Sequence, residues 1–199
     1  MRQDTGKLIV IYGINNLGKT TQAHLLVDQL KQAGSRAEYL KYPIYNIEPT
    51  GPQLNQILRS GRPQTISEIE LQEIYAQNRR DFQPQLETKL KAGDIIVAED
   101  YIGTGIAWGA AKGAPLGTLE KQNADLIPVG IAILLDGERF LEAKESNHLH
   151  ESNDELMARC RQIHQQLAEK YDWQTINANQ PPEKVAKDIW QRIESQIKN

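Results

Sequence analysis

Near the amino terminus the sequence reads Gly13-Ile14-Asn15-Asn16-Leu17-Gly18-Lys19-Thr20, between an apolar run at residues 8–12 and an amphipathic stretch at residues 18–34. The spacing matches G-x-x-x-x-G-K-[ST], a loop that joins a strand to a helix and binds phosphate. Its glycines permit a turn that aims backbone N–H groups at phosphate oxygens, and the positive end of the following helix adds to the attraction. A glycine-rich turn without a ligand is the alternative, but it would not require the lysine and the hydroxyl.

Residues of this loop have expected roles at a nucleoside triphosphate. Lys19 neutralises the β and γ oxygens, and the Thr20 hydroxyl binds Mg²⁺, which bridges the same two phosphates. The predicted cofactors are therefore ATP and Mg²⁺. We expect the nucleotide to contact Gly13, Asn15, Asn16, Leu17, Gly18, Lys19, Thr20 and Thr21.

A magnesium site of this kind needs a second anchor, usually an acidic residue that ends a neighbouring buried strand. Glu99 and Asp100 follow the apolar run at residues 95–98, so both are candidate metal ligands. Ligands of open α/β sheets lie beyond the carboxyl ends of the strands, which places this pair beside the phosphate loop. A solvated helix start is the alternative interpretation. Asp136, at the end of another apolar run, is a weaker candidate for the same role.

Apolar runs alternate with helical patterns along the whole chain, which is typical of a parallel sheet covered by helices on both faces. The pattern predicts an α/β fold of three layers with a five-stranded parallel sheet, the P-loop kinase fold. The expected strands cover residues 8–12, 37–40, 95–98, 131–135 and 173–176, and the expected helices cover residues 18–34, 67–92, 101–111, 151–171 and 181–197.

Two further features concern proline. Pro84 lies inside the second expected helix, so we expect a kink or a break there. Residues 43–63 contain four of the nine prolines, which predicts an irregular arm with one short helix. Arms of this kind often carry substrate contacts.

The bulk composition narrows the class of protein. A chain of 199 residues is expected to form a single domain, here residues 1–199 with a lid at about residues 137–150. The net charge of -3 argues against a general affinity for nucleic acid. Cys160 is the only cysteine, so an internal disulfide is excluded and a reducing, cytoplasmic location is expected. No signal-peptide pattern precedes residue 8, and no apolar run approaches the ~20 residues that span a membrane.

Beyond the phosphate loop, the motifs resemble those of the thymidylate kinases over nearly the whole chain. The basic-aromatic-proline turn of that family appears as Lys41-Tyr42-Pro43, and its aromatic-x-x-N/D-R segment as Tyr75-Ala76-Gln77-Asn78-Arg79. Gly93-Asp94-Ile95-Ile96-Val97 leads to the position of the family's Asp-Arg-Tyr, and Gly105-Ile106-Ala107-Trp108 resembles the stretch that follows it. The resemblance implies substrate contacts from Asn15, Tyr42, Pro43, Tyr75, Arg79, Asp100, Tyr101, Trp108 and His150.

The chemistry of the middle helix agrees with this resemblance. Tyr75 lies four residues before Arg79, so both project from one helix face. An aromatic ring stacks on a pyrimidine, and a guanidinium can fork onto a base or a phosphate. Ordinary core packing is the alternative for Tyr75 and Trp108, and a solvated basic pair is the alternative for Arg79 and Arg80.

Three departures from the family pattern concern charge at the acceptor site. The Asp-Arg-Tyr motif is Glu99-Asp100-Tyr101 here, so a carboxylate replaces an arginine. Asn15 stands where the family usually places an acid, and Tyr12 where it commonly has glutamate. The lid lacks an arginine-rich run, and Arg139 and Lys144 are its candidate clamps.

The lid also contains His148 and His150, which lie close to Glu151. The two histidines and this glutamate suggest a metal site, but the sequence shows no further ligand at a suitable spacing. Solvated histidines in a polar loop are the more common arrangement. The resemblance instead places His150 where a lid residue approaches the base.

The resemblance implies transfer of the γ-phosphoryl group of ATP to dTMP, with Lys19, Arg79 and Glu99 as the catalytic residues. One alternative is a deoxynucleoside kinase, for which Glu48 is the only acid in the expected segment that could take the hydroxyl proton. Another is a nucleotide-binding regulator without turnover. The family often forms two-fold dimers, and an apolar stripe on residues 67–92 is a candidate homodimer surface. No nucleic-acid or membrane partner is expected.

Overall fold

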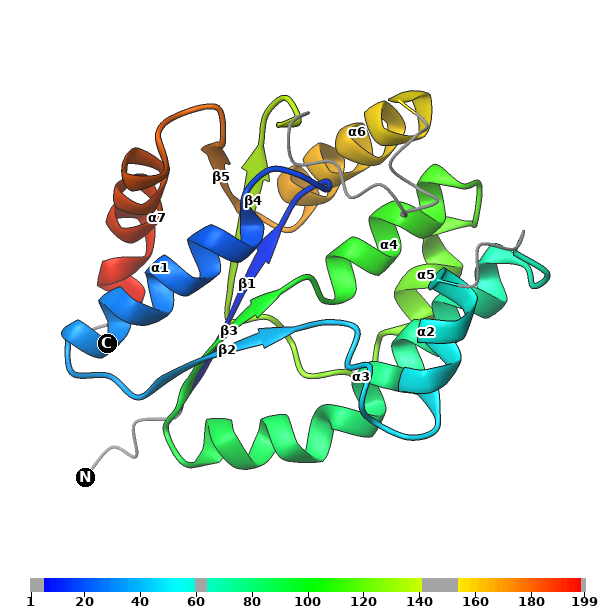
Figure 1. Ribbon diagram of the computed structural model, residues 1–199, viewed down its shortest axis with the longest axis horizontal. Coiled ribbons are helices and arrows are strands. Elements are labelled where there is room, and N and C mark those ends of the chain that lie inside the picture. The colour runs from blue at the N-terminus through cyan, green and yellow to red at the C-terminus, as the bar shows by residue number, and fades with distance from the viewer. Residues whose placement is uncertain (1–5, 60–63, 141–153, 198–199) are drawn as a thin grey trace.

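A computed structural model describes residues 6–59, 64–140 and 154–197. Its sheet has five parallel strands in the order β2-β3-β1-β4-β5, as the sequence predicts (Figure 1). The central strand β1 pairs with β3 on one side and with β4 on the other. The strands are β1 (Lys7–Tyr12), β2 (Ala37–Lys41), β3 (Ile95–Glu99), β4 (Ile131–Asp136) and β5 (Gln174–Asn177).

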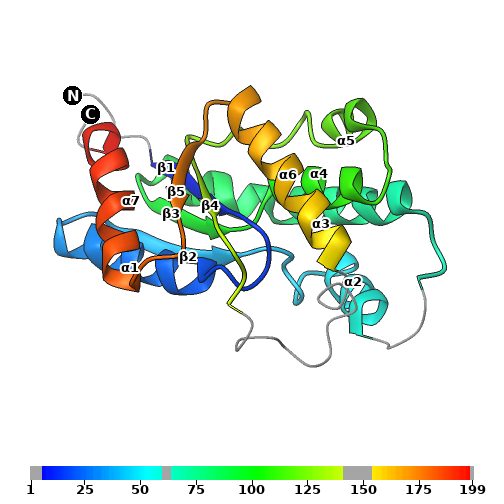
Figure 2. The same ribbon diagram turned by 90° about the horizontal axis from the view of Figure 1, so that it is seen from above.

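Helices cover both faces of this sheet, and the two views agree on their arrangement (Figures 1 and 2). Helices α1 and α7 lie on one face and pack against each other, whereas α3, α4 and α6 lie on the other. The described helices are α1 (Lys19–Gln32), α2 (Thr50–Arg59), α3 (Glu68–Lys91), α4 (Ile102–Ala111), α5 (Leu116–Gln122), α6 (Asp154–Lys170) and α7 (Pro182–Ile197).

The alternation of side chains along β1 explains how the sheet holds two layers of helices. Ile9 and Ile11 are fully buried in a cluster that includes Leu30 of α1. Val10 and Tyr12 point to the opposite face and belong to a second buried cluster. Because every residue from Leu8 to Tyr12 is buried, the strand reads as a continuous apolar run.

Of the kink or break expected at Pro84, the break is absent, because helix α3 runs as one helix across this residue. A proline inside a helix costs about 3 kcal/mol, because one backbone hydrogen bond is lost and the ring clashes with the carbonyl group four residues earlier. At its start, Ser67 accepts from the Glu70 N–H while the Glu70 carboxylate accepts from the Ser67 N–H, which is a capping box. This cap and packing against α2, α4 and α5 hold the helix together.

Two short helices lie outside the central layers. Within the described part of the arm, residues 43–59, helix α2 confirms the expected short helix. Helix α5 was not predicted, because seven residues are too few for a clear hydrophobic period. No helix among the described residues is both long and apolar enough to cross a membrane.

Candidate functional site

Unusual backbone conformations shape the phosphate loop. Gly13, Asn16 and Gly18 have φ of 140°, 63° and 78°, a region that side chains rarely adopt. At Gly13 a Cβ atom would lie 2.6 Å from the carbonyl oxygen of Leu135, so only glycine fits between the loop and β4. Helix α1 begins at Lys19, so the free N–H groups of its first turn face the loop.

Lys19 folds back over this loop. Its side chain is 6% exposed, and Nζ donates to the carbonyl oxygens of Gly13 and Ile14, both at 3.0 Å. The same ammonium lies 3.8 Å from Oδ1 of Asp100. The charge of Lys19 is thus held at the place where the motif brings the phosphates of a triphosphate.

Thr20 and Glu99 meet at the carboxyl end of β3. The Thr20 hydroxyl donates to Oε2 of Glu99 at 2.7 Å, and Lys41 Nζ lies 3.0 Å from Oε1. The hydroxyl of Tyr39 also donates to Oε2 at 2.7 Å. Burial alone would raise the pKa of Glu99, but these hydrogen bonds and the charges of Lys19 and Lys41 together lower it.

Mg²⁺ fits this pair of residues. It prefers hard oxygen ligands and is commonly held by one or two carboxylates together with substrate phosphates. Thr20 and Glu99 supply a hydroxyl and an ionised carboxylate at one point beside the phosphate loop. No group of three or more metal-binding side chains occurs in the described part of the chain, so most remaining ligands would come from phosphate and water.

Asp100 and Asp136 are engaged differently. Oδ1 of Asp100 accepts from the Thr104 hydroxyl at 2.8 Å, and burial raises the pKa of the Asp100 carboxyl. Asp136, the weaker metal candidate, accepts from Arg161 at 2.7 and 3.0 Å and from Gln165 at 3.0 Å. The contacts of Asp136 are thus with α6, whereas Asp100 belongs to the group around Lys19.

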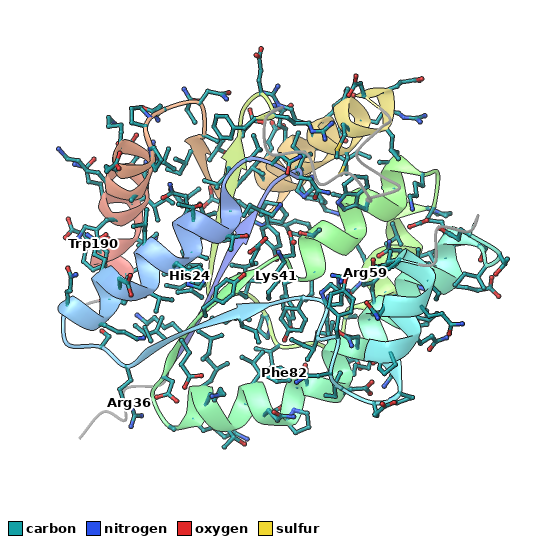
Figure 3. All side chains as sticks on the ribbon, viewed as in Figure 1. His24, Arg36, Lys41, Arg59, Phe82 and Trp190 are labelled. Carbon is teal, nitrogen blue, oxygen red and sulfur yellow. The ribbon has the colours of Figure 1, made fainter. Side chains whose placement is uncertain are left out.

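A cavity of about 730 Å³ extends from the phosphate loop to α3. Its lining includes Lys41 of β2 and Arg59 of α2, which Figure 3 labels. Most predicted site residues line this cavity: Asn15, Asn16, Leu17, Gly18, Lys19, Thr20, Thr21, Tyr42, Pro43, Tyr75, Arg79, Glu99, Asp100 and Trp108.

Two of the described residues that were predicted, Gly13 and Tyr101, are absent from that lining. Gly13 lies beneath the loop against β4. Tyr101 is 1% exposed and packs behind Tyr42, with ring centroids 5.0 Å apart, while its hydroxyl donates to Ile127. His150 falls outside the described residues, as do Lys144, His148 and Glu151.

Arg79, the last residue of α3 in the cavity lining, is a buried cation. Arg79 is 4% exposed, and its Nη1 donates to Oδ1 of Asn123 at 2.9 Å. Burial lowers the pKa of its guanidinium, although nearby tyrosines oppose the shift. Arg80 instead pairs with Asp125 and Glu73 and is absent from the lining of this cavity.

Sequence reasoning missed several lining residues, including Arg59, Gln72, Lys112, Phe140 and Gln180. Arg59 ends α2 and lies over the ring of Tyr45, 5.1 Å from its centroid. The backbone N–H of Phe140 donates to the Asn16 carbonyl at 2.9 Å, which joins the start of the lid to the phosphate loop. These residues belong to no motif, so only the fold reveals their positions.

The chain is similar in sequence to known thymidylate kinases. The family model described as thymidylate kinase matches residues 11–189. Thymidylate kinase of Xanthomonas campestris pv. campestris (strain B100) is 31% identical over 163 residues, covering 79% of this chain and 70% of that protein. Thymidylate kinase of Homo sapiens is 28% identical over 191 residues, covering 92% of this chain and 88% of that protein.

The fold agrees with these sequence matches. The solved structure of thymidylate kinase from Candida albicans superposes with a TM-score of 0.81 at 22% identity, covering 96% of this chain and 92% of that one. The chain therefore belongs to the thymidylate kinase family of nucleoside monophosphate kinases, which transfer phosphoryl groups from ATP to nucleotides.

Proposed function

We propose that this enzyme transfers the γ-phosphoryl group of ATP to the 5′-phosphate of dTMP, giving dTDP and ADP. One observation carries the proposal: a single cavity joins the phosphate loop at Lys19 and Thr20 to an aromatic and cationic end at Tyr75 and Arg79. The first end suits a triphosphate, and the second suits a pyrimidine nucleotide.

Catalysis in this scheme is positioning and charge stabilisation. An oxygen of the dTMP phosphate attacks the γ-phosphorus, the bond from that phosphorus to the β,γ-bridging oxygen breaks, and ADP leaves. Lys19 stabilises negative charge on the β and γ oxygens. Thr20 and Glu99 would hold Mg²⁺, which supplies further positive charge there when it is bound.

The acceptor phosphate needs no general base, because it is already ionised at neutral pH. Asp100 stands where many family members carry an arginine, and its Oδ1 lies 3.8 Å from the Lys19 ammonium, whose charge opposes the effect of burial on the Asp100 pKa and screens the carboxylate. Cations for the acceptor phosphate come from the lining residues Lys41 and Arg59.

A deoxynucleoside kinase is less well supported. That reaction removes a proton from a neutral 5′-hydroxyl, and Glu48 was the expected base. Glu48 is exposed and is absent from the described lining of the cavity. A binding protein without turnover is also less well supported, because Lys19, Thr20 and Glu99 converge.

We further propose that residues 1–199 act as one P-loop kinase domain, with a lid at about residues 137–150. Residues 141–153 lie outside the described structure, so this part of the lid rests on the sequence. A homodimer through α3 and a cytoplasmic location likewise stay predictions of the sequence.

The test is ADP release from ATP and Mg²⁺ with dTMP, dUMP, thymidine or no acceptor. We expect turnover with dTMP, little turnover with thymidine, and none in Lys19→Ala. Lys31→Ala is the matched control, because Lys31 is an exposed lysine in the last turn of the same helix. Turnover with thymidine alone would favour the nucleoside kinase, and no ADP release with any acceptor would favour a binding protein.

A further inference from the structure

Gln72 carries an unused hydrogen-bond acceptor beside the cavity. Its side chain is 3% exposed, and the residue lines the cavity from α3. Within the described residues, its buried carbonyl oxygen Oε1 has no hydrogen-bond partner. A buried acceptor without a partner costs free energy, so such an atom at a binding cavity points to a donor supplied by the ligand.

The orientation of this amide is fixed by its neighbours. Nε2 of Gln72 donates to Oε1 of Glu68 at 2.7 Å, and the other carboxylate oxygen of Glu68 pairs with Lys112 at 3.0 Å. An ionised carboxylate only accepts hydrogen bonds, so a reversed amide would bring two acceptor oxygens together. The side chains of Glu68 and Lys112 are only 11% and 18% exposed, so water screens their ion pair little and Glu68 is held in place. Gln72 therefore offers an acceptor, and not a donor, to a ligand.

A donor lies beside this acceptor. A Cβ atom placed on Gly105 would lie 2.7 Å from Nη2 of Arg79 and 3.0 Å from Oε1 of Gln72. Both polar groups thus approach the same point on α4, and the absence of a side chain at Gly105 makes room for them. Nε of Arg79 is a further buried donor without a partner in the described part of the chain. Tyr75 and Trp108, which also line the cavity, bring aromatic rings to this end.

We propose that Gln72, held by the Glu68–Lys112 pair, selects a pyrimidine that carries a ring N–H beside a carbonyl group. Its Oε1 accepts from N3–H of thymine or uracil while Arg79 donates to O4. This inference rests on the proposed function, because it assumes that the base of the acceptor nucleotide occupies this end of the cavity.

Cytosine in the same position makes two mismatches. Its N3 is an acceptor and would face the oxygen of Gln72, and its N4 amino group would face the guanidinium of Arg79. A site built to hydrogen-bond one edge discriminates strongly, because the wrong base leaves buried groups unpaired. Gln72 is thus a specificity-determining residue, and Glu68 and Lys112 are residues that position it.

The test compares the affinities of dTMP and dCMP by calorimetry in the full-length enzyme and in Gln72→Met, which keeps an unbranched side chain but removes the acceptor. We expect the wild-type enzyme to prefer dTMP at least about 100-fold and the preference to fall at least about tenfold in Gln72→Met. Gln77→Met is the matched control, because Gln77 is an exposed glutamine of α3 that bonds to Asp81. An unchanged preference in Gln72→Met would overturn the inference.

Two further measurements make the result specific. Glu68→Gln frees the amide to reverse, so the preference for dTMP should also fall while the protein stays folded. A 3-methyl-dTMP ligand lacks the N3–H donor, so wild-type enzyme should bind it less tightly than dTMP, and Gln72→Met should distinguish the two much less. If Gln72→Met keeps the full wild-type difference between these ligands, Gln72 does not contact N3–H.

These binding measurements separate this inference from the proposed reaction. Selective binding of dTMP that depends on Gln72, without formation of dTDP, would support the inference and contradict the reaction. Turnover of dTMP with the same base preference in Gln72→Met would support the reaction and contradict the inference. Equal affinity of the wild-type enzyme for dTMP and dCMP would also overturn the inference.

Discussion

The hydroxyl of Thr20 lies 2.7 Å from the carboxylate of Glu99, although 79 residues separate them in sequence. Their meeting follows from the sheet, since β1 leads into the phosphate loop and pairs in parallel with β3, which ends at Glu99. Parallel strands place their carboxyl ends at one edge, where α/β folds bind ligands. This pair is the structural basis of the proposed magnesium site.

Replacement of Glu99 tests that site. Glu99→Gln removes the charge but keeps an oxygen that can accept from Tyr39 and Thr20, so the local structure should persist. We expect the Mg²⁺ concentration for half-maximal rate to rise at least about tenfold, because a metal site loses an anionic ligand. Steady-state kinetics with Mg²⁺ varied will measure this. Glu38→Gln on β2, an exposed glutamate paired with Lys89, should leave the requirement unchanged.

Asp100 is predicted to oppose the acceptor phosphate and not to hold the metal, because its oxygen contacts Thr104 and Lys19. Asp100→Asn removes the charge and tolerates the φ of 63° at this position. We expect the KM for dTMP to fall by about threefold to tenfold through relief of repulsion, with the Mg²⁺ requirement unchanged. A higher Mg²⁺ requirement in this variant would instead identify Asp100 as a metal ligand.

Arg79 is predicted to act through the fork of its guanidinium. Arg79→Lys keeps a cation but cannot donate to Asn123 and to a nucleotide in the same way. We expect the KM for dTMP to rise about 10- to 100-fold, since hydrogen bonds to charged groups are strong, while the KM for ATP changes little. Initial rates at varied concentrations of both nucleotides give this comparison. The neighbouring Arg80→Lys, which alters a surface ion pair, should change neither constant appreciably.

His164 should make stability depend on pH. It is 1% exposed, and burial lowers its pKa from 6.5 to about 4. Between these values the unfolded chain binds a proton that the native state does not, so the free energy of unfolding falls as the pH falls. The contribution is about 2 kcal/mol between pH 7 and pH 5.

Urea unfolding at several pH values measures this contribution. In His164→Gln the decline between pH 7 and pH 5 should be smaller by that amount, whatever the variant's stability at pH 7. His24→Gln, at an exposed position on α1, is the control for removing a histidine. An equal decline in wild type and His164→Gln would contradict the prediction.

Local sequence rules found the parts of the site that follow strands. The motif from Gly13 to Thr20 and the acids Glu99 and Asp100 each come directly after a buried run, so their place in the fold could be predicted. Three of the strands, β1, β3 and β4, were predictable for the same reason, because each is a short and mainly apolar segment, whereas β2 and β5 are only partly apolar. Tyr75 and Arg79 followed from helical spacing together with the family resemblance.

Contacts between distant elements could not be predicted in this way. The partner of Arg79 is Asn123, just after the short helix α5, and no sequence pattern joins them. The bond from Tyr39 to Glu99 depends on the neighbouring strand β2. A break at Pro84, one of the two expected outcomes, is absent because tertiary packing and a capping box outweigh the cost of a proline inside the helix. Gln72 belongs to no sequence motif, and only the fixed orientation of its amide and its unpaired oxygen identify it as a candidate specificity residue.

Phosphorus NMR of the complete reaction tests the central claim most directly. The enzyme is incubated with ATP, Mg²⁺ and dTMP, and the phosphorus signals of dTMP, dTDP, ADP and inorganic phosphate are followed together. We expect the two phosphorus signals of dTDP to appear in step with those of ADP, with little inorganic phosphate and with no dTDP in Lys19→Ala. Formation of ADP and inorganic phosphate without dTDP, or no reaction of dTMP while thymidine is converted to dTMP, would contradict the account.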